Sequence, residues 1–167
     1  MSERLIAFPP VCREDANILI LGSMPSVASL QEGFYYGHPR NAFWRILAEI
    51  YHSPLPTDIE AKKALLIDNR IALWDSLNAC RREGSLDSAI REPELNNFGL
   101  FFARCPHIEK VIFNGGTAHR LFMKRGAGFL EGKRWAVMPS TSPAYTLSYE
   151  RKLALWRQAL VEQYESL

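Results

Sequence analysis

Short runs of apolar residues alternate along the chain with segments in which apolar residues recur every three to four positions. The continuous runs predict strands at residues 17–23, 70–77, 109–116 and 133–143, the first of them buried on both faces. The periodic segments predict helices at residues 41–52, 57–69, 92–106, 116–126 and 148–167. A chain that alternates in this way predicts an α/β fold, a three-layer α/β/α sandwich with a central four-stranded parallel sheet.

Residues suited to helix ends support four of the predicted helices. Asn41 and Ser148 precede the first and the last helix, where each is a suitable N-cap. Thr57 and Glu60 have the spacing of a capping box at the start of the second helix. Gly126 stands at the end of the fourth helix, where glycine commonly closes a helix.

Each predicted strand is followed by a polar or glycine-containing segment. These segments are GSMPS (22–26), WDSLNACRREGSLDSAI (74–90), NGG (114–116) and PSTSPAY (139–145). A further polar and aromatic segment, YYGHPRN (35–41), lies between the first strand and the next helix. In open parallel sheets ligands bind outside the carboxyl ends of the strands, so the sequence predicts one shared site there.

The composition indicates the size of the folded domain and the cellular compartment in which it is expected. The 167 residues, 47% hydrophobic and 23% charged, suffice for one globular domain over 1–167. The net charge of +2 permits a nucleic-acid partner without demanding one. No apolar run is long enough to span a bilayer, and the N-terminus is unlike a signal peptide. Three widely separated cysteines, Cys12, Cys80 and Cys105, are expected to be reduced thiols in a cytoplasmic protein.

Several common kinds of catalytic site are missing from the sequence. GSMPS lacks the second glycine and the Lys-Ser/Thr pair of a phosphate-binding loop, and no GxGxxG opens the first helix. The four histidines are scattered and the cysteines form no zinc pattern, so neither a metal nor a cofactor is expected. Asp75 and Asp87 are candidates for an acid/base pair, although Asp87 could equally cap a turn.

The predicted site is rich in aromatic, amide and hydroxyl groups. Tyr35 and Tyr36 offer flat faces, whereas Asn41 and Asn114 offer amide donors and acceptors. Hydroxyl groups follow the first and the last strand, at Ser23, Ser140, Thr141 and Ser142. Such groups suit a flat heterocycle that is held by stacking and read at its edge. The alternative is that both tyrosines belong to the core and that Asn41 only caps a helix.

These segments resemble motifs of the uracil-DNA glycosylase superfamily. GSMPS fits its first motif, a Gly-x-x-Pro turn, and YGHPRNAFW (36–44) is similar to the segment that follows in the mismatch-specific branch. PSTSPA (139–144) is similar to the second motif of the hypoxanthine-DNA glycosylase branch, which LWDSL, GSLDSAI and FNGG also resemble. The resemblance covers nearly the whole chain. It implies a monofunctional, monomeric DNA glycosylase of base excision repair that removes hypoxanthine, with uracil or xanthine as further substrates, from double-stranded DNA.

The same resemblance implies a role for each residue of the site. Asn41 and Ser23 are the candidate catalytic residues. The candidate base-binding residues are Tyr36 as a stacking platform, Met24 and Pro25 in the turn, Asn114 as a reader of the base edge, and His38. The candidate DNA-binding residues are Ser140, Thr141 and Ser142, which would grip phosphates, and Pro143, Ala144 and Tyr145, where a wedge could enter the duplex.

Two departures from the family pattern bear on the activity. Ser23 and Met24 stand where many members carry an Asn or Asp that positions the attacking water. Tyr145 stands where the branch often has Asn. The sequence therefore leaves open three other functions: a mismatch-specific uracil-DNA glycosylase, a non-catalytic module that binds damaged DNA, and an enzyme acting on free nucleosides.

Overall fold

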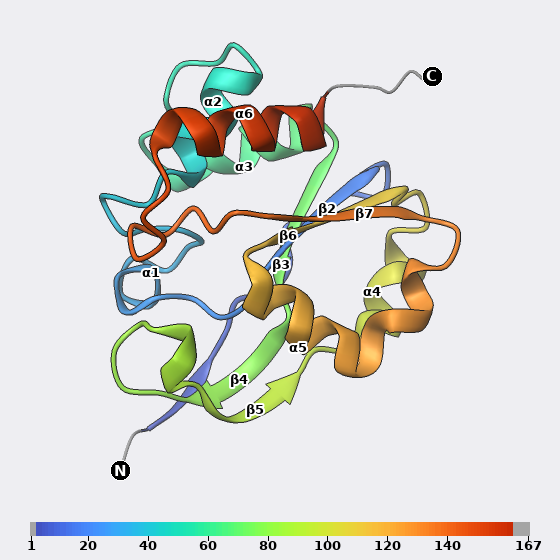
Figure 1. Cartoon of the computed structure of the whole chain (residues 1–167). Coiled ribbons are helices and arrows are strands. Elements are labelled where there is room, and N and C mark those ends of the chain that lie inside the picture. The colour runs from blue at the N-terminus through green and yellow to red at the C-terminus, as the bar shows by residue number, and fades with distance from the viewer. Residues whose placement is uncertain (1–2, 162–167) are drawn as a thin grey trace.

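A four-stranded parallel sheet forms the centre of the protein (Figure 1). In a computed structural model, which describes residues 3–161, its order is β3 (Ile71–Asp75), β2 (Ile18–Gly22), β6 (Lys110–Asn114) and β7 (Arg134–Met138). All three neighbouring pairs are parallel, with Ile20 opposite Leu73 on one side and Ile112 on the other. The four strands that the apolar runs predicted are thereby confirmed.

Helices cover both faces of this sheet, as Figure 1 shows. On one face lie α2 (Phe43–Ile50), α3 (Ile59–Asp68) and α6 (Tyr149–Leu160), and on the other lie α4 (Phe98–Arg104) and α5 (Gly116–Gly126). The side chains of β2 alternate between the two cores: Ile20 packs with the first group, and Leu19 and Leu21 with the second. Both faces of β2 are buried, which confirms the three-layer α/β/α sandwich.

The ends of the helices agree with the predictions in part. The hydroxyl of Ser148 accepts a hydrogen bond from the Arg151 N–H and caps α6, as predicted. The prediction of a capping box at Thr57 is wrong, because Asp58 is the N-cap of α3. The last predicted helix reached residue 167, whereas α6 ends at Leu160; residues 162–167 lie outside the described part of the chain.

The predicted helix over residues 92–106 is only half right. Residues 98–104 form α4, but the preceding segment is a strand, β5 (Arg91–Leu95). It pairs with β4 (Leu77–Arg81), which pairs with β1 (Arg4–Ile6), so a second, antiparallel sheet lies beside the first. The local sequence could not show this sheet, because its pairings join residues far apart in the chain.

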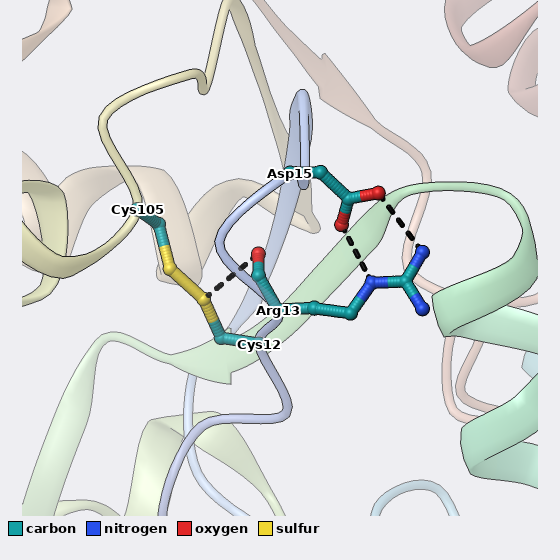
Figure 2. The surroundings of a disulfide bond; sticks show 4 residues. All are labelled: Cys12, Arg13, Asp15 and Cys105. Atoms are coloured by element: carbon teal, nitrogen blue, oxygen red, sulfur yellow. Dashed lines mark hydrogen bonds and ion pairs between the residues drawn. A yellow bond between two sulfur atoms is a disulfide. The ribbon is translucent and has the colours of Figure 1, made fainter.

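The expectation of three reduced cysteines is also wrong for two of them. Cys12 and Cys105 form a disulfide that joins the segment before β2 to the end of α4 (Figure 2). Next to it, the Arg13 guanidinium donates two hydrogen bonds to the Asp15 carboxylate, at 2.7 and 2.9 Å. Cys80 remains a free thiol in the core. The two bonded cysteines are 93 residues apart, so their meeting is a consequence of the fold.

The strand order places a crevice between two central strands. From β2 the chain moves outward to β3, and it then returns to the other side of β2 to form β6 and β7. The direction of the connections reverses between β2 and β6, which is where ligands bind in sheets of this kind. None of the described helices has the length and apolar character needed to cross a membrane.

Candidate active site

A cleft of about 1160 Å³ opens at the carboxyl ends of the parallel strands. The segments that line it include the turn after β2, the segment that leads to α2, the loop between β4 and β5, the end of β6 with the residues that follow it, and the loop after β7. All of the predicted site residues line this cleft, namely Ser23, Met24, Pro25, Tyr36, His38, Asn41, Asn114, Ser140, Thr141, Ser142, Pro143, Ala144 and Tyr145. The fold thus brings together segments that are more than 100 residues apart.

The floor of the cleft is formed by Gly22, Tyr36 and Asp75. A side chain at position 22 would place its Cβ 2.6 Å from Asp75 Oδ1 and 2.6 Å from the hydroxyl oxygen of Tyr36. These two oxygens therefore lie no more than twice that distance apart, and only glycine fits between them. The hydroxyl of Tyr36 and Asp75 Oδ2 are both buried without a hydrogen-bond partner in the described part of the chain. Unpartnered buried polar groups are uncommon and tend to occur at functional sites.

Burial changes the ionisation of both groups on this floor. Asp75 is 2% exposed, and its burial raises its pKa to about 7, against the attraction of Arg82 and with the repulsion of Asp87. Burial and the neighbouring Asp75 charge raise the pKa of Tyr36, against the effect of Asn114. The backbone of Tyr36 has φ of 54°, a left-handed conformation that is unfavourable for a residue with a side chain.

One side of the cleft, here called the acidic wall, consists of the turn over residues 22–27 and the loop over residues 82–90. The Ser23 hydroxyl donates to Asp87 Oδ1 at 2.7 Å, and the Val27 N–H donates to the Ser85 hydroxyl at 2.9 Å. Arg82, 4% exposed, donates to the carbonyl oxygens of Pro25 and Ser85. The loop after β4 is therefore fastened to the turn after β2 at several points.

This arrangement changes the interpretation of the two aspartates. In the sequence Asp75 and Asp87 are candidates for an acid/base pair, although a long loop separates them. In the structure both residues line the same cleft. Arg82 lies near enough to act on the pKa of Asp75, and Asp87 acts on it in the opposite direction. Sequence reasoning missed Arg82, because an arginine in the run CRREG is typical of an exposed loop.

Asn41 lies between the two sides of the cleft, directly before α2. Its Oδ1 accepts a hydrogen bond from the Phe43 N–H at 2.9 Å, but the N-cap of α2 is Ala42, so the prediction that Asn41 is the N-cap is wrong by one residue. The next residue, Ala42, donates its N–H to the Thr141 carbonyl at 3.0 Å, which ties α2 to the loop after β7. Within residues 3–161 no group accepts from Asn41 Nδ2, which leaves this amide as a hydrogen-bond donor at the cleft.

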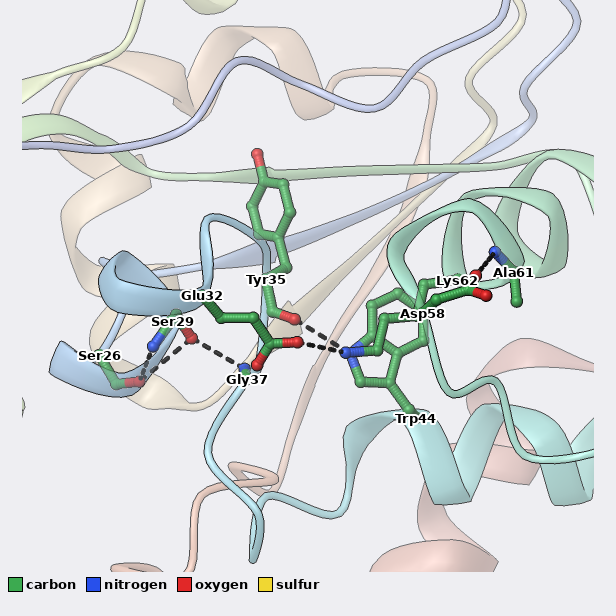
Figure 3. A network of polar contacts seen from close by, with 9 residues as sticks. All are labelled: Ser26, Ser29, Glu32, Tyr35, Gly37, Trp44, Asp58, Ala61 and Lys62. Carbon is green, nitrogen blue, oxygen red and sulfur yellow. Dashed lines mark hydrogen bonds and ion pairs between the residues drawn. The ribbon is translucent and has the colours of Figure 1, made fainter.

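The segment before Asn41 is held by α1 (Val27–Glu32) and by α2, as Figure 3 shows. The Ser29 hydroxyl accepts from the Gly37 N–H, and the Trp44 indole donates to the Tyr35 carbonyl. Tyr35 borders the cleft but is a core residue, 2% exposed, and its hydroxyl donates to the Pro9 carbonyl. Of the two tyrosines, only Tyr36 lies on the cleft floor.

His38 and Met24 have structural contacts as well. His38 Nδ1 accepts from the Arg40 N–H at 3.0 Å, so the proton of the neutral ring is on Nε2. The side chain of Met24 packs in a small core with Leu77 and Leu121, which leaves the backbone of the turn to face the cleft. His38 therefore presents its Nε2 edge, and Met24 contributes main chain.

The opposite side of the cleft, here called the hydroxyl wall, consists of Asn114 and the loop over residues 139–145. Asn114 Nδ2 donates to Thr141 Oγ1 at 3.0 Å, and its Oδ1 accepts from the Thr141 N–H at 2.9 Å. Thr141 is 1% exposed, and its N–H and its Oγ1 are both bonded to the Asn114 amide, so its burial argues against the predicted contact with phosphate. Ser140 and Ser142 accept from the N–H groups of Ser142 and Ala144 and keep their own O–H groups as donors.

Two residues of α6 support the hydroxyl wall from behind. The Trp156 indole donates to the Pro139 carbonyl, and buried Lys152 donates to the Ser142 carbonyl, both at 3.0 Å. The Lys152 ammonium also lies 5.7 Å from the ring centroid of Tyr145. Burial lowers the pKa of Lys152. Sequence reasoning missed both, because a tryptophan and a lysine in an amphipathic helix have ordinary structural uses.

Within the part of the chain that the structure describes, no three His, Cys, Asp or Glu side chains gather closely enough to hold a metal ion. The groups at the cleft include a donor amide, an aromatic ring, several hydroxyls, the imidazole of His38, two exposed guanidinium groups, and two carboxylic groups near the buried guanidinium of Arg82.

Comparisons with known proteins find similarity to DNA glycosylases over most of the chain. Residues 9–164 match a model of the uracil DNA glycosylase superfamily. A hypoxanthine DNA glycosylase of Methanosarcina acetivorans is 41% identical over 139 residues, which cover 82% of this chain and 85% of that protein. A hypoxanthine DNA glycosylase of Methanosarcina barkeri is 41% identical over 109 residues, covering 65% and 69%. The solution NMR structure of a proposed uracil DNA glycosylase from Methanosarcina acetivorans has a TM-score of 0.82 at 34% identity, covering 95% of this chain and 97% of that one.

Proposed function

Because the chain belongs to the uracil DNA glycosylase superfamily, we propose that it is a monofunctional DNA glycosylase that removes hypoxanthine from DNA. It would hydrolyse the N-glycosidic bond of a deoxyinosine turned out of the duplex and leave an abasic site. The names of two relatives at 41% identity support hypoxanthine as the base. We also propose that the protein acts as a monomer.

The observation that carries this proposal is the hydrogen bonding of the Asn41 side chain. Its Oδ1 is bonded to the Phe43 N–H, which fixes the amide plane and leaves Nδ2 as a donor at the cleft. When the glycosidic bond breaks, negative charge develops on the departing base, and a fixed donor stabilises that charge without having to reorganise. One such donor contributes on the order of 3 kcal/mol to lowering the barrier. Nδ2 could donate either to the base or to the attacking water.

Other residues of the cleft have complementary roles in this proposal. One face of the Tyr36 ring packs on Phe43, with 4.2 Å between ring centroids, so the opposite face can stack on a flipped base. Ser23 and the main chain at Met24 and Pro25 form the turn beneath that base. The amide of Asn114 bonds twice to Thr141, so we assign it first to holding the hydroxyl wall and only then to reading the base.

The edge of the cleft offers donors to the DNA backbone. The hydroxyl groups of Ser140 and Ser142 retain their protons for phosphate oxygens, because each accepts a backbone N–H through a lone pair. Arg40 and Arg151 are exposed and line the same cleft, so they add positive charge near the bound strand. Tyr145 is half exposed and lines the cleft at the end of the hydroxyl wall, which supports the proposal that its side chain enters the duplex.

A strand-cleavage assay tests the proposal. A labelled duplex with one deoxyinosine opposite thymine is incubated with the protein and then treated with alkali, which cuts at abasic sites. We expect cleavage only after alkali, and we expect Asn41→Ala to reduce the single-turnover rate by about 10²–10³. Asn69→Ala is a matched control, because Asn69 ends α3 away from the cleft.

The same assay separates the remaining functions. A duplex with a G·U mismatch tests uracil as the preferred base. A protein that binds the deoxyinosine duplex and produces no abasic site would be a damage-binding module. Undiminished excision by Asn41→Ala would contradict the role given to its amide.

A further inference from the structure

Two buried polar atoms on the floor of the cleft have no hydrogen-bond partner among residues 3–161. They are the hydroxyl oxygen of Tyr36 and Oδ2 of Asp75. Gly22 separates the two side chains, and a Cβ at that position would lie 2.6 Å from the Tyr36 hydroxyl and 2.6 Å from Asp75 Oδ1. A buried polar group without a partner is costly. The two side chains are therefore candidates to bond to each other across the space that glycine leaves open.

The backbone of Tyr36 directs its side chain to this floor. It has a left-handed conformation, with φ of 54°. Its neighbours are fixed, because the Gly37 N–H donates to the Ser29 hydroxyl and the Trp44 indole donates to the Tyr35 carbonyl (Figure 3). Strain of this kind persists only where the surrounding structure imposes it, and it tends to occur at functional sites. As a result, Tyr35 lies in the core, whereas the hydroxyl of Tyr36 reaches the floor of the cleft.

Asn114 lies on the other side of the Tyr36 hydroxyl. Its Nδ2 donates to Thr141 Oγ1, which leaves a second N–H on the same nitrogen. The Asn114 side chain also acts to lower the pKa of Tyr36, which is the effect of an amide N–H directed at the hydroxyl oxygen. The Tyr36 oxygen can accept from Asn114 and still donate its own proton to Asp75. The hydroxyl thus has the contacts needed to join the hydroxyl wall to the acidic wall.

The charged and titratable groups that face Asp75 among residues 3–161 are Arg82, Asp87, Tyr35 and Tyr36. Arg82 favours the ionised carboxyl and Asp87 opposes it. Burial, and then the negative charge of Asp75, raise the pKa of both tyrosines. Burial also raises the pKa of Asp75 to about 7, so both of its forms are populated near neutral pH. The ionised form is purely an acceptor, and a hydrogen bond that it accepts is charge-assisted.

We propose that Asp75 is a positioning residue, whose carboxylate accepts a hydrogen bond from the Tyr36 hydroxyl and thereby fixes the ring on which the flipped base stacks. The bond needs an oxygen–oxygen distance of about 2.7 Å, so the two side chains close on each other as the carboxyl ionises. Packing on Phe43 supports one face of the ring, and the bond adds a fixed point at its hydroxyl end. Asp75, 2% exposed, acts only through Tyr36. This inference rests on the proposed function, because it requires a base at the ring.

An NMR titration of the protein alone tests the pair without DNA. The signal of the Tyr36 ring carbon that bears the hydroxyl should shift as the Asp75 carboxyl ionises, near pH 7. Asp75→Asn should abolish this shift. Asp68→Asn is the matched control and should retain it, because Asp68 is exposed at the end of α3. A Tyr36 signal that does not respond to the ionisation of Asp75 would overturn the pair.

Single-turnover excision of deoxyinosine supplies a second measurement. The rate should rise as the pH increases through 7, and the rise should be absent from Tyr36→Phe and from Asp75→Asn. Tyr36→Phe keeps the ring and should be about tenfold slower than the wild type at pH 8, the loss expected for one hydrogen bond to a charged group. The double variant should be no slower than Tyr36→Phe, because both changes remove the same bond. Tyr51→Phe is the control, since Tyr51 ends α2 and does not line the cleft.

Two outcomes of the excision assay are decisive against the inference. Additive losses in the double variant would show that Asp75 acts independently of the Tyr36 hydroxyl. A pH profile of Asp75→Asn with the same rise as the wild type would assign the rise to another group. If the wild type excises no base at all, the proposed function fails, and the NMR titration still decides whether Asp75 and Tyr36 are paired.

Discussion

The two walls of the cleft are held in place by different kinds of interaction. The acidic wall depends on a buried guanidinium, that of Arg82, near two carboxylic groups. The hydroxyl wall depends on neutral hydrogen bonds, in which the amide of Asn114 bonds to the main chain and side chain of Thr141. The hydroxyl wall follows strands of the parallel sheet, whereas the acidic wall combines the turn after β2 with a loop that follows β4 of the antiparallel sheet.

This difference implies that the two walls respond differently to solution conditions. A buried ionisable group makes stability depend on pH, because little water is present to solvate its charged form. Neutral hydrogen bonds among amide and hydroxyl groups have no titration in the ordinary range. The acidic wall is therefore expected to change with pH near 7, whereas the bonds between Asn114 and Thr141 in the hydroxyl wall are not.

The largest effect is expected from removing the guanidinium of the acidic wall. Arg82→Met should lower the free energy of unfolding at pH 7 by about 3–5 kcal/mol, because it leaves the Pro25 and Ser85 carbonyls without this donor and removes the attraction of Arg82 for the Asp75 carboxylate. Denaturant unfolding measures this, with Arg120→Met on the exposed side of α5 as the control. Equal stability of the two variants would mean that Arg82 does not hold this wall.

The next effect is a pH dependence of stability that originates at Asp75. The carboxyl has its usual pKa of 3.8 in the unfolded chain and about 7 in the folded protein. Between these values the folded protein holds a proton that the unfolded chain releases, so stability should fall as the pH rises from about 4 to 7 and then level off. The total is on the order of 2–4 kcal/mol. Unfolding of Asp75→Asn should lack this component, and an unchanged slope would contradict the assignment.

A smaller effect, without pH dependence, is expected on the hydroxyl wall. Thr141→Val leaves one N–H of the buried Asn114 amide without an acceptor and should destabilise the protein by about 1–3 kcal/mol. Thr141→Ser keeps the hydroxyl and serves as the control. The loss should be the same at pH 5.5 and pH 8; a loss that varies with pH would remove the contrast between the walls.

The smallest effect on stability is expected from Lys152. Replacing a buried, singly bonded ammonium by an apolar side chain of similar length is often close to neutral, so Lys152→Met should change stability by less than about 1 kcal/mol. Affinity for duplex DNA should fall by a few fold, with a weaker salt dependence, because a positive charge behind Ser142 is lost. Lys124→Met, on α5, is the control. A salt dependence equal to that of the wild type would exclude this charge from the interface.

The amino-acid sequence by itself determined the central sheet and the position of the site. Continuous apolar runs and three-to-four-residue periodicity report how each element is buried, and this burial is a local property of the chain. The glycine and polar residues after each strand were readable for the same reason, since parallel strands present their carboxyl ends at one edge. The motifs GSMPS and YGHPRN lie at the predicted place and line the predicted cleft.

Only the tertiary structure decided which polar groups are partners. It placed β5 in an antiparallel sheet, joined Cys12 to Cys105, and brought Asp87 to Ser23, 64 positions away. It also paired the amide of Asn114 with Thr141, whereas the sequence analysis expected this amide to read a base. Pairings of this kind depend on distances between elements after packing, and a local pattern of polar and apolar residues carries no information about those distances.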